Sequence, residues 1–274
     1  MIQSIDVDAL TMNIESLAEC MFTHKWINPF PKFKYSERPD TATAAILDGN
    51  IVIMVDNSPA VMIIPASIFD IIEEADDFNF SPIIGSYLRI TRFFFSIVTW
   101  ILTPLWLLFV NNPDWVPEFL KFILITDDIT VPVLLQLLIL ELAVDGLKLA
   151  AVNTPTMLST PLSIVAGIVV GEYAVSSGWF NPEALLYMAV VTVGTYGQTN
   201  FEMGYAFKFL RVLMLILTQI FNLAGFITGV VISVLMIAFN RTITGKSYIY
   251  PLIPWDGKML KRKVFRVRLP HGFK

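Results

Sequence analysis

The sequence predicts a polytopic α-helical membrane protein with a small α/β cytoplasmic head, and three observations support this fold class. Hydrophobic residues make up 55% of the 274 residues and charged residues only 15%, whereas soluble proteins carry about 25% charged residues. The mean hydropathy is +0.65. Long uncharged runs occupy the middle of the chain, and basic residues collect at its end. This composition excludes an ordinary cytosolic enzyme, a disordered protein and a nucleic-acid binder.

Charge divides the chain into three parts. Residues 1–92 carry 6 basic and 13 acidic side chains, residues 93–240 carry 4 and 9, and residues 241–274 carry 9 and 1. We therefore expect a partial cytoplasmic α/β domain at 1–80, a helical membrane domain at 81–240 and a basic cytoplasmic C-terminal tail at 241–274. The net charge of −4 averages over these three environments.

The head shows short helical and strand patterns. Apolar spacing predicts a helix within Ile2–Phe22, and Asp40 is a candidate N-cap for a short helix that ends at Leu47. Ile51–Val55 and Ala60–Ile64 flank a turn and predict a β-hairpin. Neither strand alternates cleanly, so we expect both faces to be covered. The N-terminus lacks the basic region of a secretory signal, which favours a cytoplasmic head.

Five segments of the middle region are candidates for crossing a membrane, because a span needs about 20 mostly apolar residues. Four of them lack charged residues, and the fifth is apolar at first and then continues into charged residues. In chain order they are Phe93–Pro113, Val131–Ala151, Leu149–Gly171, Ala184–Phe201 and Val212–Asn240.

The number of crossings has to be even if the head and the tail lie on one side. The basic tail favours the cytoplasm under the positive-inside rule, as the absence of a signal does for the head. One candidate must then fail to cross, or one must cross twice. Three charges oppose a simple span at Val131–Ala151. The alternative is a break in Val212–Asn240 near Asn222–Gly225, although 29 residues are short for two spans. We predict four crossings.

Basic residues at both ends of the membrane region are predicted membrane anchors. Arg89 and Arg92 directly precede the first uncharged run, and Lys261, Arg262 and Lys263 lie in the tail. Such residues are stable near anionic lipid on the cytoplasmic side.

Three carboxylates are candidates for an ion pathway. Glu141 and Asp145 lie four residues apart, with Lys148 three further on, so all three share one helix face. Ionisable groups at membrane depth often mark an ion path, and two carboxylates would favour cations. The alternative is an amphipathic helix at the membrane interface with an Asp145–Lys148 pair. Glu202, between two apolar runs, is either a loop carboxylate or a gate.

Small and polar residues in the apolar runs predict helix packing. Gly167 and Gly171 form a small-xxx-small pair, as do Gly225 and Gly229, and this spacing lets helices approach closely. The amides of Gln219 and Asn222 in the longest run are expected to hydrogen-bond between helices, with a pore-lining role as the alternative.

We predict no enzymatic activity, no cofactor and no metal site. Cys20 is the only cysteine, and the two histidines, His24 and His271, are far apart in sequence. The chain contains no Walker A, GxSxG, HExxH or GxGxxG motif.

Several ordered segments resemble the GerA-type spore germination proteins. Gly49–Pro59 is similar to the family's Gly…Val-Asp-x-Ser-Pro segment, and Phe201–Gly204 with the following Leu210-Arg211 resembles its Tyr-Glu-Leu-Gly segment and Leu-Arg pair. Gly245–Pro254 and Arg266–His271 resemble the stage V sporulation protein AF branch. Members of the family are longer, so this chain resembles their C-terminal part.

The resemblance implies a function that composition does not supply. Such proteins reside in the spore inner membrane, and their subunits are thought to form a ring, possibly a pentamer, around a path for monovalent cations. The branch is associated with release of dipicolinic acid. We therefore expect a channel-like homo-oligomer that works with other germination membrane proteins in the lipid bilayer and binds no nucleic acid. The alternatives are a non-conducting scaffold and a small-solute carrier.

Overall fold

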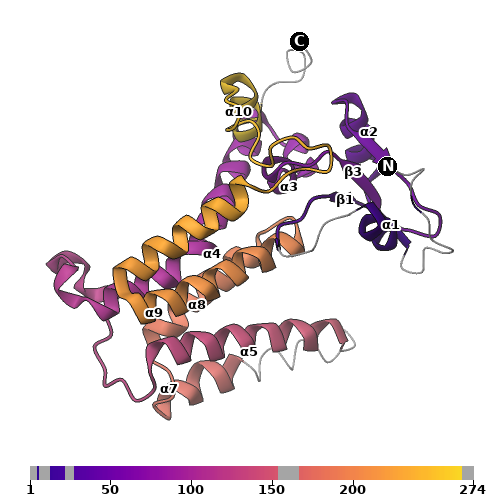
Figure 1. Ribbon diagram of the computed structural model, residues 1–274. Helices are drawn as coiled ribbons and strands as arrows, with labels where there is room; N and C mark the ends of the chain where they lie inside the picture. Colours follow the sequence, from indigo (N-terminus) through magenta and orange to yellow (C-terminus); the bar gives the residue numbers. More distant parts are fainter. Residues whose placement is uncertain (1–4, 6–12, 22–27, 154–166, 267–274) are drawn as a thin grey trace. The chain divides into compact units, whose positions relative to one another are not determined.

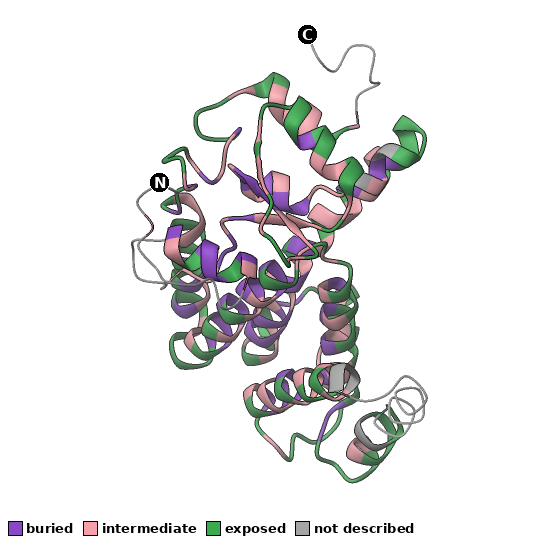
Figure 2. Cartoon of the chain, turned by 90° about the vertical axis from the view of Figure 1, so that its right-hand side faces the viewer, coloured by how far each residue is buried: buried purple, intermediate pink, exposed green. Residues whose placement is uncertain are grey.

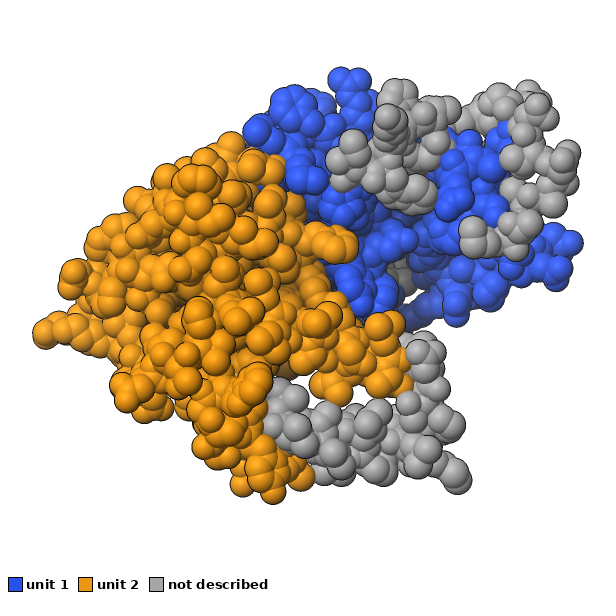
Figure 3. All heavy atoms as spheres, turned by 60° about the horizontal axis from the view of Figure 1, so that its bottom comes forward, with its two compact units in different colours: residues 1–94, 198–206, 233–274 blue, residues 95–197, 207–232 orange. Residues whose placement is uncertain are grey.

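The computed structural model describes residues 5, 13–21, 28–153 and 167–266, and these residues are mostly helical with one three-stranded sheet (Figure 1). The chain divides into two compact units (Figure 3). Unit 1 comprises residues 1–94, 198–206 and 233–274, and unit 2 comprises residues 95–197 and 207–232. Most of the predicted span Leu149–Gly171, both histidines and the tail residues Arg268 and Lys274 lie outside the described residues.

Unit 1 contains the antiparallel sheet. Its strands are β1 (Lys34–Ser36), β2 (Ile51–Ile53) and β3 (Val61–Ile64), in the order β1-β3-β2. Ile51 pairs with Ile64, which confirms the predicted hairpin. The helix α1 (Asn13–Met21) lies within the predicted range and packs its apolar face on β3. The expectation that both strands are covered on both faces is wrong for β2, because Ile51 is more than half exposed.

The short helices of unit 1 begin at identifiable caps. In α2 (Pro39–Leu47), Arg38 holds the N-cap position and Pro39 begins the helix, so the prediction that Asp40 caps it is wrong. Proline suits the first helical position because it has no N–H to satisfy, which moves Asp40 into the first turn. Ser67 and Asp70 form a capping box at α3 (Ile68–Ile72).

The tail forms a helix of its own within unit 1. Asp256 accepts hydrogen bonds from the backbone N–H groups of Lys258 and Met259, and α10 (Gly257–Val264) follows. Its last turn carries three basic residues, which suits the partial negative charge of a helix C-terminus.

Two described helices are long and apolar enough to cross a membrane, namely α4 and α9. The other described helical segments of the middle region are shorter. With α4 and α9 included, the helical segments in chain order are η2 (Ala75–Asn79), α4 (Pro82–Asn111), η3 (Pro113–Trp115), η4 (Glu118–Ile123), α5 (Val133–Asn153), η5 (Ile168–Tyr173), α7 (Ala174–Ser176), α8 (Pro182–Tyr196) and α9 (Phe201–Ala238).

Unit 2 is held together by an apolar core between α4, α5, α8 and α9. Its fully buried members include Leu107, Leu137, Ala184 and Leu215. Figure 2 shows buried residues alternating with exposed ones along the helices, as expected for helices that each pack on one face.

The helix α9 breaks at Asn222 and turns back. Asn222 has φ 52° and ψ −129°, and a Cβ on Gly225 would lie 1.8 Å from the carbonyl oxygen of Leu217. A Cβ on Gly229 would lie 2.7 Å from Cγ of Met214, whereas a straight helix would separate these residues by about 22 Å. Residues 201–221 and 223–238 are therefore two limbs of a helical hairpin, visible in Figure 1. The break lies at the start of Asn222–Gly225, the segment that the sequence offered as the alternative.

Candidate functional site: a buried charge cluster

Two acidic and two basic side chains meet inside unit 2. Nε of Arg211 donates to Oε1 of Glu141 at 2.5 Å. Nζ of Lys208 lies 3.5 Å from Oε2 of Glu141 and also pairs with Oδ2 of Asp145. We call these four residues, Glu141, Asp145, Lys208 and Arg211, the charge cluster.

Helical spacing explains why the charges match. Glu141 and Asp145 are four residues apart on α5, and Lys208 and Arg211 are three apart on the first limb of α9. Each pair therefore lies on one helix face. Because the later residue of one helix meets the earlier residue of the other, the two helices run in opposite directions. The two carboxylates and the two cations cancel in formal charge.

The backbone supplies further partners for the two cations. Arg211 donates to the carbonyl oxygen of Thr99 in α4, and Nζ of Lys208 donates to the carbonyl oxygen of Glu141 at 3.0 Å. The charge cluster thus joins α4, α5 and α9.

Burial makes this cluster unusual. The side chain of Arg211 is 2% exposed and that of Glu141 is 5% exposed. Desolvating such charges is costly, and the cost is offset only by good pairing and further hydrogen bonds. Ionisable groups inside an apolar helical bundle are candidates for a functional site by default.

Sequence reasoning found the acidic half of the cluster and missed the basic half. Lys208 and Arg211 interrupt an apolar segment with a spacing that complements Glu141 and Asp145. This spacing is the sequence pattern that indicates the basic half of the cluster. Asp145 pairs with Lys208, and Lys148 lies 5.1 Å from the centre of the Tyr196 ring.

Glu202 belongs to a different unit from the other two predicted pathway residues. It lies in the first turn of α9, it is exposed, and it is part of unit 1. Glu141 and Asp145 are part of unit 2. The structure brings Glu141 and Asp145 together at Lys208.

The four glycines predicted to pack helices have different surroundings. No described atom lies within 4 Å of a Cβ built on Gly167 or Gly171. Gly225 and Gly229 lie against residues of the first limb of their own helix, so their small size permits the close approach of the two limbs.

A second group of charges lies in unit 1 and includes the predicted anchors Arg89 and Arg92. Arg89 lies 2.6 Å from Oε1 of Glu73 and 3.2 Å from Oδ2 of Asp77, and Arg92 donates to the same Asp77 oxygen at 2.7 Å. The side chain of Arg89 is 2% exposed. These two arginines are therefore held by carboxylates of the head.

The tail joins the same group through the predicted anchor Lys263. Its Nζ lies 2.5 Å from Oδ1 of Asp70 and 3.0 Å from Oε2 of Glu73. Of the other two predicted anchors, Lys261 is exposed, and Arg262 accepts a hydrogen bond from Arg89 at its backbone oxygen.

The pairing of Lys263 changes the pKa values on both sides. Burial opposes the charged form of each group. The attraction of Glu73 and Asp70 outweighs burial and raises the pKa of Lys263, while Lys263 and Ser67 outweigh burial and lower the pKa of Asp70. Both groups are thus held in their charged forms.

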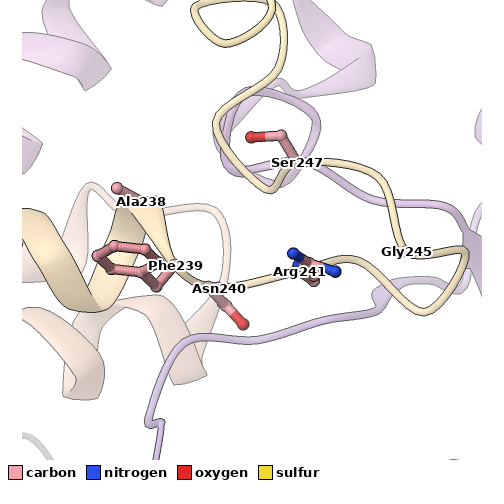
Figure 4. A pocket seen from close by; sticks show the side chains of 6 residues that line it. All are labelled: Ala238, Phe239, Asn240, Arg241, Gly245 and Ser247. Carbon is pink, nitrogen blue, oxygen red and sulfur yellow. The ribbon is translucent and has the colours of Figure 1, made fainter.

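A shallow hollow lies at the C-terminal end of α9, lined by Ala238, Phe239, Asn240, Arg241, Gly245 and Ser247 (Figure 4). The exposed cation Arg241 follows the end of the helix, where the partial negative charge of the carbonyl groups favours a positive side chain.

Within the described ranges, no group of three or more His, Cys, Asp or Glu residues could hold a metal ion.

Comparison with known proteins places the chain in a family. A family model described as Bacillus/Clostridium GerA spore germination protein matches residues 1–273. The chain therefore belongs to the GerA family of spore germination proteins.

Among individual relatives, stage V sporulation protein AF of Bacillus subtilis (strain 168) is 35% identical over 269 residues, covering 98% of this chain and 54% of that protein. Spore germination protein XA of Bacillus anthracis is 26% identical over 276 residues, with 100% and 54% covered. Uncharacterized membrane protein YfkQ of Bacillus subtilis (strain 168) is 25% identical over 232 residues, with 82% and 45% covered. The chain thus spans about half the length of these relatives. No solved structure matches it.

Proposed function

We propose that this chain is a membrane subunit of the spore germination machinery and that it forms part of a path for monovalent cations. Membership in the GerA family supports the role in germination, and the apolar helices α4 and α9 support the membrane location. The observation that carries the conducting role is the buried charge cluster, because paired ionisable groups within apolar helices often mark ion paths.

The charge cluster suggests how such a path is controlled. Glu141 and Asp145 would attract a cation if they were unpaired, but Lys208 and Arg211 hold them in ion pairs. We propose that the described arrangement is the closed one, and that conduction requires separation of α5 from α9. Glu202, exposed in the first turn of α9, would act as an entry carboxylate.

The hairpin in α9 supports a topology with the head and the tail on the cytoplasmic side. The contacts Thr99–Arg211 and Asn112–Asn222 show that α4 and the first limb of α9 run in the same direction, and the second limb returns. A helix that crosses, turns and comes back contributes two crossings, so the five candidate segments together give six crossings, an even number. The second limb has 16 residues, or about 24 Å, which is short for a hydrocarbon core of about 30 Å.

The family relationship supports the remaining parts of this proposal. The chain would act in the spore inner membrane as a ring-forming homo-oligomer beside other germination proteins, and its similarity to stage V sporulation protein AF supports a link to dipicolinic acid release. Lys261 and Arg262 in the tail would anchor it to anionic lipid.

The second candidate is a non-conducting scaffold for other germination proteins. Phe119 and Phe122 in η4 favour it, because both are about three-quarters exposed and could bury their rings against a partner.

Flux of K⁺ or Na⁺ from liposomes separates the two candidates. The purified chain should release the trapped cation, and neutralising both acids with Glu141→Gln and Asp145→Asn should reduce selectivity for cations over chloride. Absence of flux from a correctly folded, oligomeric preparation would instead support the scaffold. Flux with unchanged selectivity would remove these two carboxylates from the path.

A further inference from the structure

Two threonines inside unit 2 have fully buried hydroxyl groups. Thr103 lies in α4 and Thr218 in the first limb of α9, and both are 0% exposed. No described residue forms a hydrogen bond with either hydroxyl. Buried polar groups in folded proteins nearly always have a partner, so these two hydroxyls require one.

Six hydroxyls on the described helices donate to the carbonyl oxygen four residues earlier. The pairs are Thr43 with Pro39, Ser86 with Pro82, Thr91 with Tyr87, Thr192 with Met188, Thr195 with Val191 and Thr228 with Ala224. For Thr103 the corresponding acceptor is the carbonyl oxygen of Thr99, which instead accepts from Arg211. Arg211 thus donates to the carbonyl oxygen that Thr103 would use.

The two hydroxyls lie between two polar contacts that join α4 to α9. At one level Arg211 donates to Thr99. At another level Asn112 and Asn222 exchange hydrogen bonds of 2.6 and 2.9 Å through their amides. The rise of a helix places Thr103 about 6 Å beyond Thr99 and Thr218 about 10 Å beyond Arg211, at intermediate levels.

The spacing along α9 places its polar residues on one face. Thr218 and Asn222 follow Arg211 by seven and eleven residues, which are close to two and three helical turns. A polar seam therefore follows the contact between α4 and α9 and consists of Thr99, Thr103, Asn112, Arg211, Thr218 and Asn222.

We propose that this polar seam holds ordered water on the hydroxyls of Thr103 and Thr218, and that the water carries cations between the charge cluster and the Asn112–Asn222 pair. Buried water bonds to otherwise unsatisfied polar groups, and a chain of such waters lowers the cost of moving a charge through an apolar bundle. The transport part rests on the proposed channel function, and the hydration part does not.

Thermal unfolding of Thr103→Val and Thr218→Val tests the hydration part, because the direction of the Tm shift depends on whether water is bound. Valine keeps the branched shape and removes the hydroxyl. If the hydroxyls hold water, each substitution removes a water-mediated hydrogen bond and should lower the Tm by roughly 2–4 °C. If the sites are dry, valine removes an unsatisfied polar group and raises the Tm. A rise in both variants would overturn the proposal.

Cation flux from liposomes tests the transport part. The double variant Thr103→Val with Thr218→Val should lose at least about ten-fold in flux, because an apolar step of that size disfavours hydrated ions. The matched control is Thr192→Val in α8, whose hydroxyl donates to Met188 at 2.8 Å outside the polar seam; its flux should equal that of the wild type. Unchanged flux in the double variant would exclude the polar seam as the route.

The two experiments distinguish an error in the proposed channel function from an error in the hydrated polar seam. A wild-type chain without flux would contradict the proposed channel function, while the Tm shifts would still decide whether the polar seam is hydrated. Normal wild-type flux combined with higher Tm values and unchanged flux in the variants would contradict only the hydrated polar seam.

Discussion

At the scale of the residue, Arg211 is the member of the charge cluster that contacts α4. It pairs with Glu141 and donates to the carbonyl oxygen of Thr99, so it joins three helices with one planar guanidinium. Lysine could not reproduce this, because the fork of the guanidinium donates in two fixed directions at once.

Removal of Arg211 should therefore destabilise the protein strongly. Arg211→Met leaves Glu141 buried with only the more distant Lys208 near it, and breaking a buried pair in this way costs about 3–5 kcal/mol. Denaturant unfolding in detergent measures this loss. The double variant Arg211→Met with Glu141→Leu should recover most of it, because no unpaired charge remains.

A matched control uses an ion pair at the surface. Arg38 pairs with Asp40, and both side chains are more than one-third exposed, so Arg38→Met should change the unfolding free energy little. Equal losses in Arg38→Met and Arg211→Met would show that burial does not decide the strength of these pairs.

The pair of Lys263 and Asp70 makes stability depend on pH at both extremes. The pKa of Asp70 is lowered below its ordinary 3.8, so its contribution is complete above that value and is lost as pH falls through the lowered pKa. The pKa of Lys263 is raised above its ordinary 10.5, so its contribution is complete below that value and is lost as pH rises through the raised pKa.

We predict that Lys263→Met moves the acid loss of stability to higher pH. Without the ammonium group, the pKa of Asp70 returns toward its ordinary value, and protonation begins earlier as the pH falls. Tm measured between about pH 2 and 5 checks this. Lys258→Met, at an exposed position of the same helix α10, should keep the wild-type profile; the same shift in both variants would argue against a specific role for the pair.

At the scale of the element, the hairpin in α9 depends on two positions. Asn222 adopts a positive φ, which asparagine tolerates better than most residues. Gly225 lies where any side chain would collide with the backbone of Leu217. Asn222 is further held by Asn112, so the break is fixed by contacts as well as by backbone preference.

Gly225→Ala should therefore disrupt the hairpin, because the new methyl carbon would lie 1.8 Å from the carbonyl oxygen of Leu217. Backbone cannot yield as a flexible side chain does, and we expect a loss of several kcal/mol or failure to fold. Gly171→Ala is the matched control, since no described atom lies within 4 Å of its Cβ. Wild-type stability of Gly225→Ala in denaturant would contradict the close contact of the two limbs.

Local signals explain which elements the sequence could predict. The hairpin of β2 and β3 followed from two apolar runs around Asp56–Pro59. The amide and the glycine within the longest apolar run indicated the break in α9 only as an alternative. The cap of α2 was wrong because Pro39 takes the first helical position. The basic half of the charge cluster was missed because Lys208 is 63 residues from Asp145, and matching helical spacing does not by itself say which helices are neighbours.

At the scale of the whole molecule, the direction of each helix follows from its contacts. Glu141 and Asp145 meet Arg211 and Lys208 in reverse order, so α5 runs against the first limb of α9. Contacts of Trp106 with Tyr187 and of Thr99 with Gly194 show that α8 runs against α4. In unit 2, α4 and the first limb of α9 therefore run in one direction, and α5 and α8 run in the opposite direction.

This arrangement predicts which sites a membrane-impermeant thiol reagent reaches. In a Cys20→Ser background, Asp114→Cys reports on the end of α4, Leu223→Cys on the tip of the α9 hairpin and Lys258→Cys on the tail. Asn112 bonds to Asn222, so the first two sites lie at one end of the bundle and should be labelled from the same, outer side of sealed vesicles. Lys258→Cys should be labelled only after the vesicles are opened, because the basic tail favours the cytoplasm. If α9 crossed once without turning back, its middle residue would lie in the hydrocarbon core, and Leu223→Cys would stay unlabelled under both conditions.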